Sequence, residues 1–257
     1  TLLCFSSYGK VYWIKVYRLP RGGRNAKGRP IVNLLPLEKD ERIQAVLPVK
    51  EFNDDQFIFM ATETGSVKKT KLSAYSRPMK SGIKAIKLRD GDRVVNAEIT
   101  DGTKEIMLFS NSGKSIRFKE SDARPMGRVS QGVRGMRIDK DQKIISLVVL
   151  EEGNILVATE NGYGKQTLKD EFSIQKRGGK GVIAIQTSDR NGNLIGAKQV
   201  STGDEVMFIS TSGNLIRTRT DDISIIGRNT QGVRLIRLSE DDNLLGMEKV
   251  ISEDDEE

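Results

Sequence analysis

The sequence contains no histidine among its 257 residues and only one cysteine, Cys4. Histidine is the commonest general base and metal ligand in proteins, so its absence argues strongly against an enzyme active site. A single cysteine excludes both a disulfide framework and a cysteine-based metal site. We therefore expect no catalytic residues, metal ligands or cofactors in this chain, and we interpret Cys4 as a buried structural thiol in a reducing compartment.

Long apolar runs are also missing. LVVL at 147–150 is among the longest, whereas a membrane helix requires about 20 apolar residues. We therefore expect a soluble chain without a membrane partner. The chain starts at Thr1 and continues into the apolar stretch LLCF without a basic leader or a cleavage site. This start favours a fragment of a longer, cytoplasmic polypeptide over a secreted protein.

One pattern is present five times: an apolar strand and a small polar step that end at a glycine. The copies are LLCFSSYG at 2–9, FMATETG at 59–65, MLFSNSG at 107–113, LVATENG at 156–162 and MFISTSG at 207–213. The five turn glycines are 56, 48, 49 and 51 residues apart. A second glycine follows each of them by 19, 17, 19, 19 and 19 residues and begins a further predicted strand. These strands are GRPIVNLL at 28, GIKAIKL at 82, GVRGMRI at 132, GVIAIQ at 181 and GVRLIRL at 232.

Each repeat closes with a third predicted strand, such as RIQAVLPV at 42 and NLLGMEKV at 243. Alternation with period 2 is clear in SIRFK at 115–119, whereas sustained stripes of helical period are missing, so we predict short strands. A repeat of about fifty residues with about four strands is typical of a propeller blade. We predict an all-β, propeller-like fold of four-stranded blades. Five repeats are visible, and we expect a sixth blade that residues upstream of Thr1 complete.

Charge is segregated along the chain, whose net charge is +7. Five segments run from a turn glycine to just past the second glycine: 9–29, 65–84, 113–134, 162–181 and 213–234. Together they contain 28 basic and 6 acidic residues, whereas the rest of the chain contains 14 basic and 29 acidic residues. Their net charges fall along the chain as +7, +6, +4, +3 and +2. Cations repeated at blade spacing suit a polyanion that touches several blades, and duplex nucleic acid is the obvious one.

The loop QKRGGKG at 175–181 is one copy of a recurring basic loop. The other copies are RGGRNAKG at 21–28, RPMKSG at 77–82, RPMGRVSQG at 124–132 and IGRNTQG at 226–232. Their glycines would let the backbone approach phosphate groups, and their cations supply charge. The aromatic residues are scattered, so stacking on single-stranded bases is not indicated. We therefore favour contacts to the backbone of a duplex.

Several long stretches resemble the C-terminal domain of bacterial DNA gyrase A. They are GRPIVNLLPLEKDERI at 28–43, FMATETGSVKKT at 59–70, LFSNSGKSIRFKES at 108–121, ENGYGKQT at 160–167 and ISIIGRNTQGVRLIR at 223–237. The resemblance implies a six-bladed β-pinwheel over residues 1–251 that wraps duplex DNA on its outer rim, so that gyrase can introduce negative supercoils. Residues 252–257, SEDDEE, resemble the start of the acidic tail of the family.

The resemblance also implies partners and a parent enzyme. The parent would be an ATP-dependent type II topoisomerase, an A2B2 assembly of gyrase A and gyrase B in the bacterial cytoplasm, associated with the nucleoid. ATP and magnesium would act only in other parts of that enzyme. The hallmark box of the family is QRRGGKG in the first blade, whereas here QKRGGKG lies in the fourth repeat with Lys176 in place of an arginine. This difference leaves open whether the chain alone completes a wrap.

The candidate DNA-binding residues combine the charged segments with this box. They are Lys10, Lys15, Arg18, Arg21, Arg24, Lys27, Arg29, Lys68, Lys69, Lys71, Arg77, Lys80, Lys84, Arg117, Lys119, Arg124, Arg128, Arg134, Lys165, Gln175, Lys176, Arg177, Gly178, Gly179, Lys180, Gly181, Arg217, Arg219, Arg228 and Arg234.

Three alternatives stay open at this point. The corresponding domain of topoisomerase IV also resembles a pinwheel, but it typically has less regular blades and no intact box. A propeller that serves as a protein-interaction scaffold would have a mixed or apolar face, which the charge segregation disfavours. An enzyme would have to rely on carboxylate pairs such as Asp54 with Asp55 or Asp221 with Asp222, which are typical turn residues.

Overall fold

The computed structural model describes residues 1–22, 26–239 and 241–250. The chain divides into two compact units, the first with residues 1–103 and 123–134 and the second with residues 104–122 and 135–257. Within the described residues, regular structure consists of β-strands and short 3₁₀ turns. The predicted all-β class is therefore confirmed. No helix in this part of the chain has the length and apolar character needed to cross a membrane.

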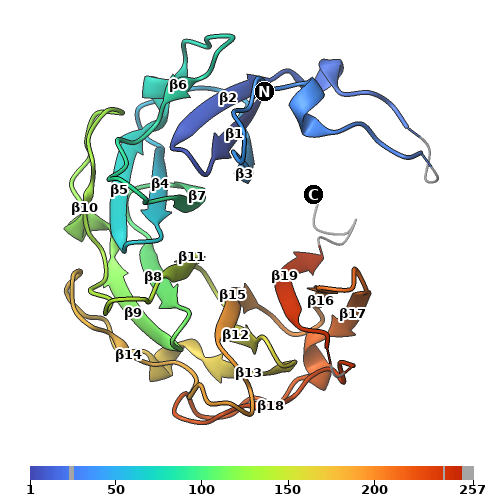
Figure 1. Cartoon of the computed structure of the whole chain (residues 1–257). Helices are drawn as coiled ribbons and strands as arrows, with labels where there is room; N and C mark the ends of the chain where they lie inside the picture. The colour runs from blue at the N-terminus through green and yellow to red at the C-terminus, as the bar shows by residue number, and fades with distance from the viewer. Residues whose placement is uncertain (23–25, 240, 251–257) are drawn as a thin grey trace. The chain divides into compact units, whose positions relative to one another are not determined.

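The first unit contains two antiparallel sheets of four strands, whose strands lie side by side in Figure 1. The strand orders are β3-β1-β2-β6 and β10-β5-β4-β7. The strands are β1 (Leu2–Ser6), β2 (Lys10–Ile14), β3 (Ile43–Pro48), β4 (Phe57–Thr62), β5 (Ser66–Lys71), β6 (Ile83–Lys84), β7 (Val94–Thr100) and β10 (Val133–Arg134).

The second unit contains two further four-stranded sheets and one sheet in which three strands are described. The strand orders are β11-β8-β9-β14, β15-β12-β13-β18 and β17-β16-β19. The strands are β8 (Glu105–Ser110), β9 (Lys114–Lys119), β11 (Ile144–Leu150), β12 (Asn154–Thr159), β13 (Tyr163–Leu168), β14 (Val182–Ile183), β15 (Leu194–Val200), β16 (Glu205–Ser210), β17 (Leu215–Arg219), β18 (Val233–Arg234) and β19 (Leu244–Val250).

Three strands of every sheet come from one repeat. The first two form a hairpin around the turn glycine, as Gly65 does between β4 and β5 with a φ of 84°. The third strand pairs back with the first, as β7 does with β4, and a shift in register near its start marks a bulge. A short 3₁₀ turn follows the second strand of each hairpin, and one extra turn, η2, lies in the first repeat. These turns are η1 (Val16–Arg18), η2 (Ile31–Asn33), η3 (Leu72–Tyr75), η4 (Glu120–Asp122), η5 (Lys169–Glu171) and η6 (Thr220–Asp222).

The fourth strand of each complete sheet comes from the following repeat. The strands β6, β10, β14 and β18 have two residues each and pair with β2, β5, β9 and β13. We call the residues that lead into them, 76–84, 123–134, 172–183 and 223–234, the crossover segments. The complete sheets have four strands each, as predicted, but the last strand of each comes from the next repeat, where two residues form a strand only through their pairing with the preceding sheet.

The counterpart in the first repeat, residues 15–35, differs from the other copies, and we call it the first-repeat loop. The strand predicted at GRPIVNLL is wrong: residues 31–33 form η2 instead. No sheet of an earlier repeat is present in the described residues for this loop to join. At the other end of the repeat series, β17 pairs with β16 alone among the described strands.

A glycine at the start of each short strand allows the crossover. Gly132 has a φ of 84°, and a Cβ atom there would lie 2.5 Å from the carbonyl oxygen of Val67. Gly181 has a φ of 73°, and its Cβ would lie 2.2 Å from the carbonyl oxygen of Ser115. Only glycine combines this left-handed backbone with so close an approach to the preceding sheet.

The core lies between the facing sheets of each unit. In the first unit, Phe5 and Val11 of one sheet pack with Ile58, Met60 and Val94 of the other. In the second unit, two further clusters are centred on residues 107–109 with 155–157 and on residues 156–158 with 206–208. Cys4 is buried, as predicted, and burial raises its pKa to about 11. In central strands such as β4, β8 and β12, mid-strand side chains are buried whichever way they point.

Candidate nucleic-acid interface

The crossover segments and the first-repeat loop contain no Asp or Glu. The six acidic residues of the five charged segments defined from the sequence lie in the 3₁₀ turns η4, η5 and η6. Each crossover segment ends in a strand at the edge of its sheet, opposite the third strand of the repeat (Figure 1). Cations thus lie along one edge of each four-stranded sheet without a carboxylate in the same segment.

Most of the predicted cations in these segments are exposed. The exposed members of the predicted set are Lys15, Arg18, Arg21, Lys27, Arg29, Arg77, Lys80, Lys84, Arg124, Arg134, Lys176, Lys180 and Arg234, with Lys71, Lys119, Arg217 and Arg219 at hairpin strands. Arg24 and residues 251–257, which include the predicted acidic tail, lie outside the described residues.

Lys68 and Lys165 are placed differently from the prediction, because neither side chain has exposed surface. The ammonium group of Lys165 donates to the carbonyl oxygens of Gly227 (2.5 Å) and Arg228 (2.6 Å) and to Oγ1 of Thr230 (3.0 Å). Lys68 donates in the same way to the carbonyl oxygens of Ala85 (2.6 Å) and Arg128. Such buried groups cannot reach a phosphate in this conformation, so we leave them out of the proposed interface.

Burial also changes the ionisation of these two lysines. Desolvation lowers the pKa of Lys68 to about 7, and the charge of Arg128 acts in the same direction. Desolvation lowers the pKa of Lys165 to about 8, with Arg228 acting in the same direction and Glu171 opposing it. Both lysines act as supports: each holds the backbone of a crossover segment at the arginine of its basic loop.

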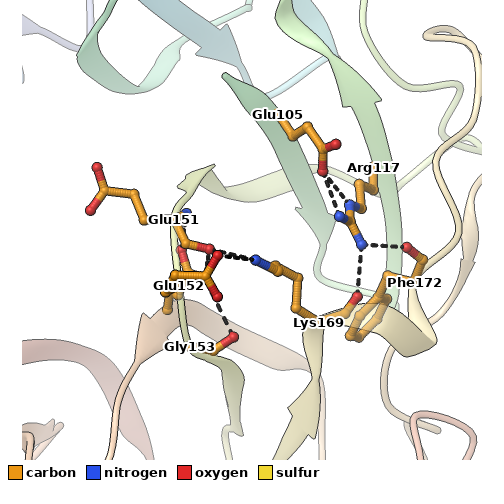
Figure 2. Close-up of polar contacts among 8 residues, drawn as sticks. Glu105, Arg117, Glu151, Glu152, Gly153, Lys169 and Phe172 are labelled. Carbon is orange, nitrogen blue, oxygen red and sulfur yellow. Dashed lines mark hydrogen bonds and ion pairs between the residues drawn. The ribbon is translucent and has the colours of Figure 1, made fainter. Parts of the chain in front are cut away.

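Arg117 also supports the backbone of the following repeat, and Figure 2 shows its contacts. Its guanidinium group pairs with Glu105 at 2.6 Å and donates to the carbonyl oxygens of Lys169 (2.9 Å) and Phe172 (3.0 Å). Gln166 has the same place in the next hairpin and donates to the carbonyl oxygens of Thr220 and Ile223. In these two hairpins, the side chain four residues after the turn glycine ties down the 3₁₀ turn of the following repeat, so we leave Arg117 out of the proposed interface.

Four more predicted residues are engaged within the protein. Lys69 is buried, with its ammonium 5.1 Å from the centroid of the Phe57 ring. Lys10 pairs with Glu38 at 2.5 Å and Lys71 with Asp54 at 3.6 Å. Arg217 pairs with Glu205. An exposed ion pair contributes little stability, so Lys71 and Arg217 can exchange their carboxylates for phosphates, whereas the burial of Lys69 removes it from the proposed interface.

The arginines of the three longer crossover loops occupy matching positions. Arg128, Arg177 and Arg228 lie three residues after 125, 174 and 225, which bridge the preceding hairpin. Each of the three is partly exposed. Arg177 Nε donates to the carbonyl oxygen of Asp122 (2.8 Å) and Arg228 Nη1 to that of Ile183 (3.1 Å). A guanidinium group has five N–H donors, so each of these bonds orients its group, and the bond of Arg228 leaves donors for an anion.

Backbone bonds hold QKRGGKG in place. The amide of Gln175 donates to Arg117 and that of Gly178 donates to Gly135 at 2.6 Å, so these N–H groups are not available to a phosphate. The carbonyl oxygen of Gly179 accepts from the amide of Arg137. Lys176 and Lys180 are exposed. The cations of the loop therefore face solvent on a fixed backbone, and Gln175, Gly178, Gly179 and Gly181 shape it.

Two further exposed arginines, Arg190 and Arg237, lie outside the predicted set, because the counted segments ended at Gly181 and Arg234. Arg190 lies over the ring of Tyr163, with its Cζ 4.9 Å from the ring centroid. No local pattern in SDRNG distinguishes Arg190 from a turn residue. In the part of the chain that the structure describes, no group of three or more Cys, Asp or Glu side chains could hold a metal ion.

The comparisons with known proteins agree with this geometry. A family model described as "DNA gyrase C-terminal domain, beta-propeller" matches residues 1–50, 56–101, 104–151, 153–201 and 204–251, one match for each repeat. The DNA gyrase A protein of Salmonella typhimurium is 51% identical over 258 residues, and that of Escherichia coli is 52% identical over 257 residues. Both alignments cover 100% of this chain and 29% of the relative.

Two solved structures share the fold. The "Structure of DNA gyrase A C-terminal domain" has a TM-score of 0.84 and 27% identity, and the match covers 97% of this chain and 82% of that one. The "Crystal structure of the C-terminal domain of DNA topoisomerase IV" has a TM-score of 0.90 and 26% identity, with 97% and 78% covered. Structural likeness alone thus does not separate gyrase from topoisomerase IV, whereas the family model and the curated relatives favour gyrase.

Fold and charge together define a repeat protein whose antiparallel sheets take an edge strand from the following repeat and carry cations in the segments that contain those strands. The chain belongs to the family of DNA gyrase A C-terminal domains. It spans 29% of the length of the curated relatives described above.

Proposed function

We propose that this chain binds and bends duplex DNA through the crossover segments and the first-repeat loop, without catalysing a reaction itself. The observation that carries the proposal is the absence of carboxylates from these segments together with the exposure of their cations. Bending a duplex of 20–30 base pairs by 40–90° costs of order 1–6 kcal/mol. Release of counterions at many phosphate contacts can offset that cost.

Backbone contacts to a duplex fit better than stacking on single-stranded bases. Tyr17 is 79% exposed beside Lys15 and Arg18, whereas Tyr12 and Tyr75 are buried in the core. A single-strand binder needs a series of exposed rings along its basic groove, and one exposed tyrosine does not supply it. The support of the arginine loops by Lys68 and Lys165 likewise suits a rigid basic surface.

In this proposal, the parent protein is an ATP-dependent type II topoisomerase that introduces negative supercoils in the bacterial cytoplasm. The partners of the chain are duplex DNA, the rest of gyrase A, and gyrase B in an A2B2 assembly. The wrapped duplex supplies the handedness of the reaction. ATP, magnesium and the DNA-cleaving residues belong to other parts of that assembly, so this chain needs no cofactor.

The salt dependence of duplex binding tests the proposal. Each neutralised phosphate contributes about 0.9 to the log–log slope of affinity against salt, so we expect a slope steeper than about −4 with little dependence on DNA sequence. Replacing Lys80, Lys84 and Arg134 by Ala should make the slope less steep by about 1 for each phosphate that is no longer neutralised. Matched replacement of Lys39, Lys50 and Lys140, which are exposed outside these segments, should change it little. A slope near −1, or equal effects of the two triple variants, would contradict the proposal.

A further inference from the structure

A cleft of about 420 Å³ opens in the second unit beside Tyr163, the first residue of β13. Three arginines line it: Arg190 from the loop before β15, Arg234 of β18 and Arg237 from the loop after β18. All three side chains are exposed, whereas Tyr163 is only 5% exposed. Neither Arg190 nor Arg237 belongs to the interface described above.

Two of the arginines converge on the same ring. The guanidinium carbon of Arg190 lies 4.9 Å and that of Arg234 5.3 Å from the centroid of Tyr163. Nη2 of Arg234 also donates to the phenol oxygen at 2.8 Å. Attraction to the ring offsets part of the repulsion between these like charges. An anion bound between the two guanidinium groups would compensate the rest of this repulsion. The cleft should therefore attract negative charge.

The described lining residues do not neutralise the charge of the three arginines. Among the described residues, none of the three arginines forms an ion pair with a carboxylate. Asp242 is the one acidic residue in the described lining, and its oxygens accept bonds from Oγ1 of Thr211 (2.6 Å) and Oγ of Ser212 (2.7 Å). These hydroxyl groups hold the pKa of Asp242 far below its usual range. The described lining therefore has three positive charges and one negative charge.

The equivalent cleft in the first unit shows the contrast. Its volume is similar, about 410 Å³, and Leu88 and Asp92 occupy the positions of Leu238 and Asp242, six and ten residues after the second glycine. Its basic residues Lys10, Arg89 and Arg93 are matched by Glu38, Asp90 and Asp92. A net positive lining is thus not a general consequence of this place in the fold.

We propose that Arg190, Arg237 and Tyr163 form a phosphate-binding cleft that holds a backbone phosphate of duplex DNA beside the crossover segment ending in β18. This proposal rests on the proposed function. Guanidinium groups bind phosphate oxygens through paired N–H donors. The phenol oxygen already accepts from Arg234, so its proton is available to the phosphate. Hydrogen bonds from Arg190 and Arg234 lower the pKa of Tyr163, which strengthens that donor.

Duplex binding by variants of the 257-residue chain tests the cleft. Arg190→Gln combined with Arg237→Gln should weaken duplex binding about 3- to 10-fold and make the salt slope less steep by about 1 to 2. Tyr163→Phe, which removes only the hydroxyl group, should weaken binding about 2- to 5-fold. The matched control is Arg89→Gln with Arg93→Gln in the first-unit cleft, for which affinity and slope should not change.

A spectroscopic arm identifies the occupant. With the tyrosine rings labelled with carbon-13, the Tyr163 signal should shift on addition of duplex and far less on addition of inorganic phosphate at equal phosphate concentration. Unchanged affinity and slope in the Arg190 and Arg237 variant, while the wild-type chain binds duplex, would overturn the cleft alone. A Tyr163 shift with inorganic phosphate but not with duplex would overturn the assignment to DNA. A wild-type chain that binds no duplex would overturn the proposed function and the cleft with it.

Discussion

At the scale of single residues, the buried lysines determine how the basic loops are presented. Lys165 donates three hydrogen bonds to the loop that carries Arg228, and no carboxylate forms an ion pair with it among the described residues. An ammonium group without exposed surface costs desolvation energy, which its bonds to carbonyl oxygens offset in part. The stability of this loop should therefore depend on whether Lys165 carries its proton.

The pH dependence of stability follows from the lowered pKa of Lys165. In the folded chain this pKa is about 8, against 10.5 as the ordinary value. Between these values the unfolded chain binds more protons than the folded chain, so the free energy of unfolding rises with pH. We expect the difference between wild type and Lys165→Met to widen in favour of wild type by about 2 kcal/mol from about pH 8 to about pH 10.

Urea unfolding of both proteins across this pH range measures the difference. Lys140→Met, at an exposed lysine, is the control, and its difference from wild type should stay constant with pH. A constant difference for Lys165→Met as well would show that Lys165 titrates near its ordinary value and does not support the loop as a buried group.

Counting charges in the sequence does not show which cations are engaged within the protein, as Lys68, Lys69, Arg117 and Lys165 are. The sequence predicts basic segments correctly as a feature of composition, but it does not tell which cations face solvent. Alternation along a strand separates two faces, but in β5 and β13 the side chains on both faces are buried. Partners such as the carbonyl oxygens of Gly227 and Arg228, more than 60 residues from Lys165, become visible only in the folded chain.

At the scale of elements, the hairpins could be predicted from the sequence and the crossover could not. A hairpin is local: an apolar run, a turn glycine such as Gly113 and an alternating strand are enough. A strand of two residues such as β14 has no periodicity of its own, and it pairs with β9, which lies more than 60 residues earlier. The second glycine of each repeat, which precedes the short strand, is visible in the sequence. It does not identify the strand with which the short strand pairs.

That glycine should be essential for the crossover. In Gly132→Ala, the added Cβ would lie 2.5 Å from the carbonyl oxygen of Val67 at a φ of 84°, so β10 has to leave β5 or the sheet has to shift. We expect a loss of about 2–4 kcal/mol in the free energy of unfolding. Gly127→Ala in the same segment, where a Cβ meets nothing within 4 Å, is the matched control and should cost less than about 1 kcal/mol. Comparable losses in the two variants would show that the close approach is not a constraint.

The charged elements should also differ in strength along the chain. The first segment has a net charge of +7 and the last +2. In the last segment, Arg217 pairs with Glu205, and Arg228 and Arg234 donate within the protein. Replacing Arg21, Arg24, Lys27 and Arg29 by Ala should therefore weaken duplex binding more than replacing Arg217, Arg219, Arg228 and Arg234, by about 10-fold. Titrations of one duplex at one salt concentration compare the two, and equal losses would mean that the charge gradient has no part in binding.

At the scale of the whole molecule, the five repeats and their family could be predicted because the pattern is long and regular. Five turn glycines and five second glycines in near-constant spacing allow few other folds. The fold class and the family match this prediction. The origin of the fourth strand in each sheet could not be predicted in the same way. The sequence repeat has the same length whether that strand comes from the same repeat or from the next one.

The last prediction separates binding from bending. Lys176 and Lys180 are exposed on a backbone that hydrogen bonds hold in place, and Arg177 is oriented by the carbonyl oxygen of Asp122. We propose that a duplex reaches this fourth repeat only after it has contacted the earlier ones. Replacing all three residues by Ala should weaken binding of a long duplex about 10-fold or more. A duplex too short to span several repeats should lose less than about 3-fold in affinity.

In the intact gyrase that we propose as the parent, the same change should reduce supercoiling more than relaxation, because relaxation does not require a bent segment. The test is to measure supercoiling and relaxation on this variant enzyme and on the control variant in which Lys39, Lys50 and Lys140 are replaced. Unchanged supercoiling, or equal losses for long and short duplexes, would restrict QKRGGKG to the role of an ordinary turn that positions β14.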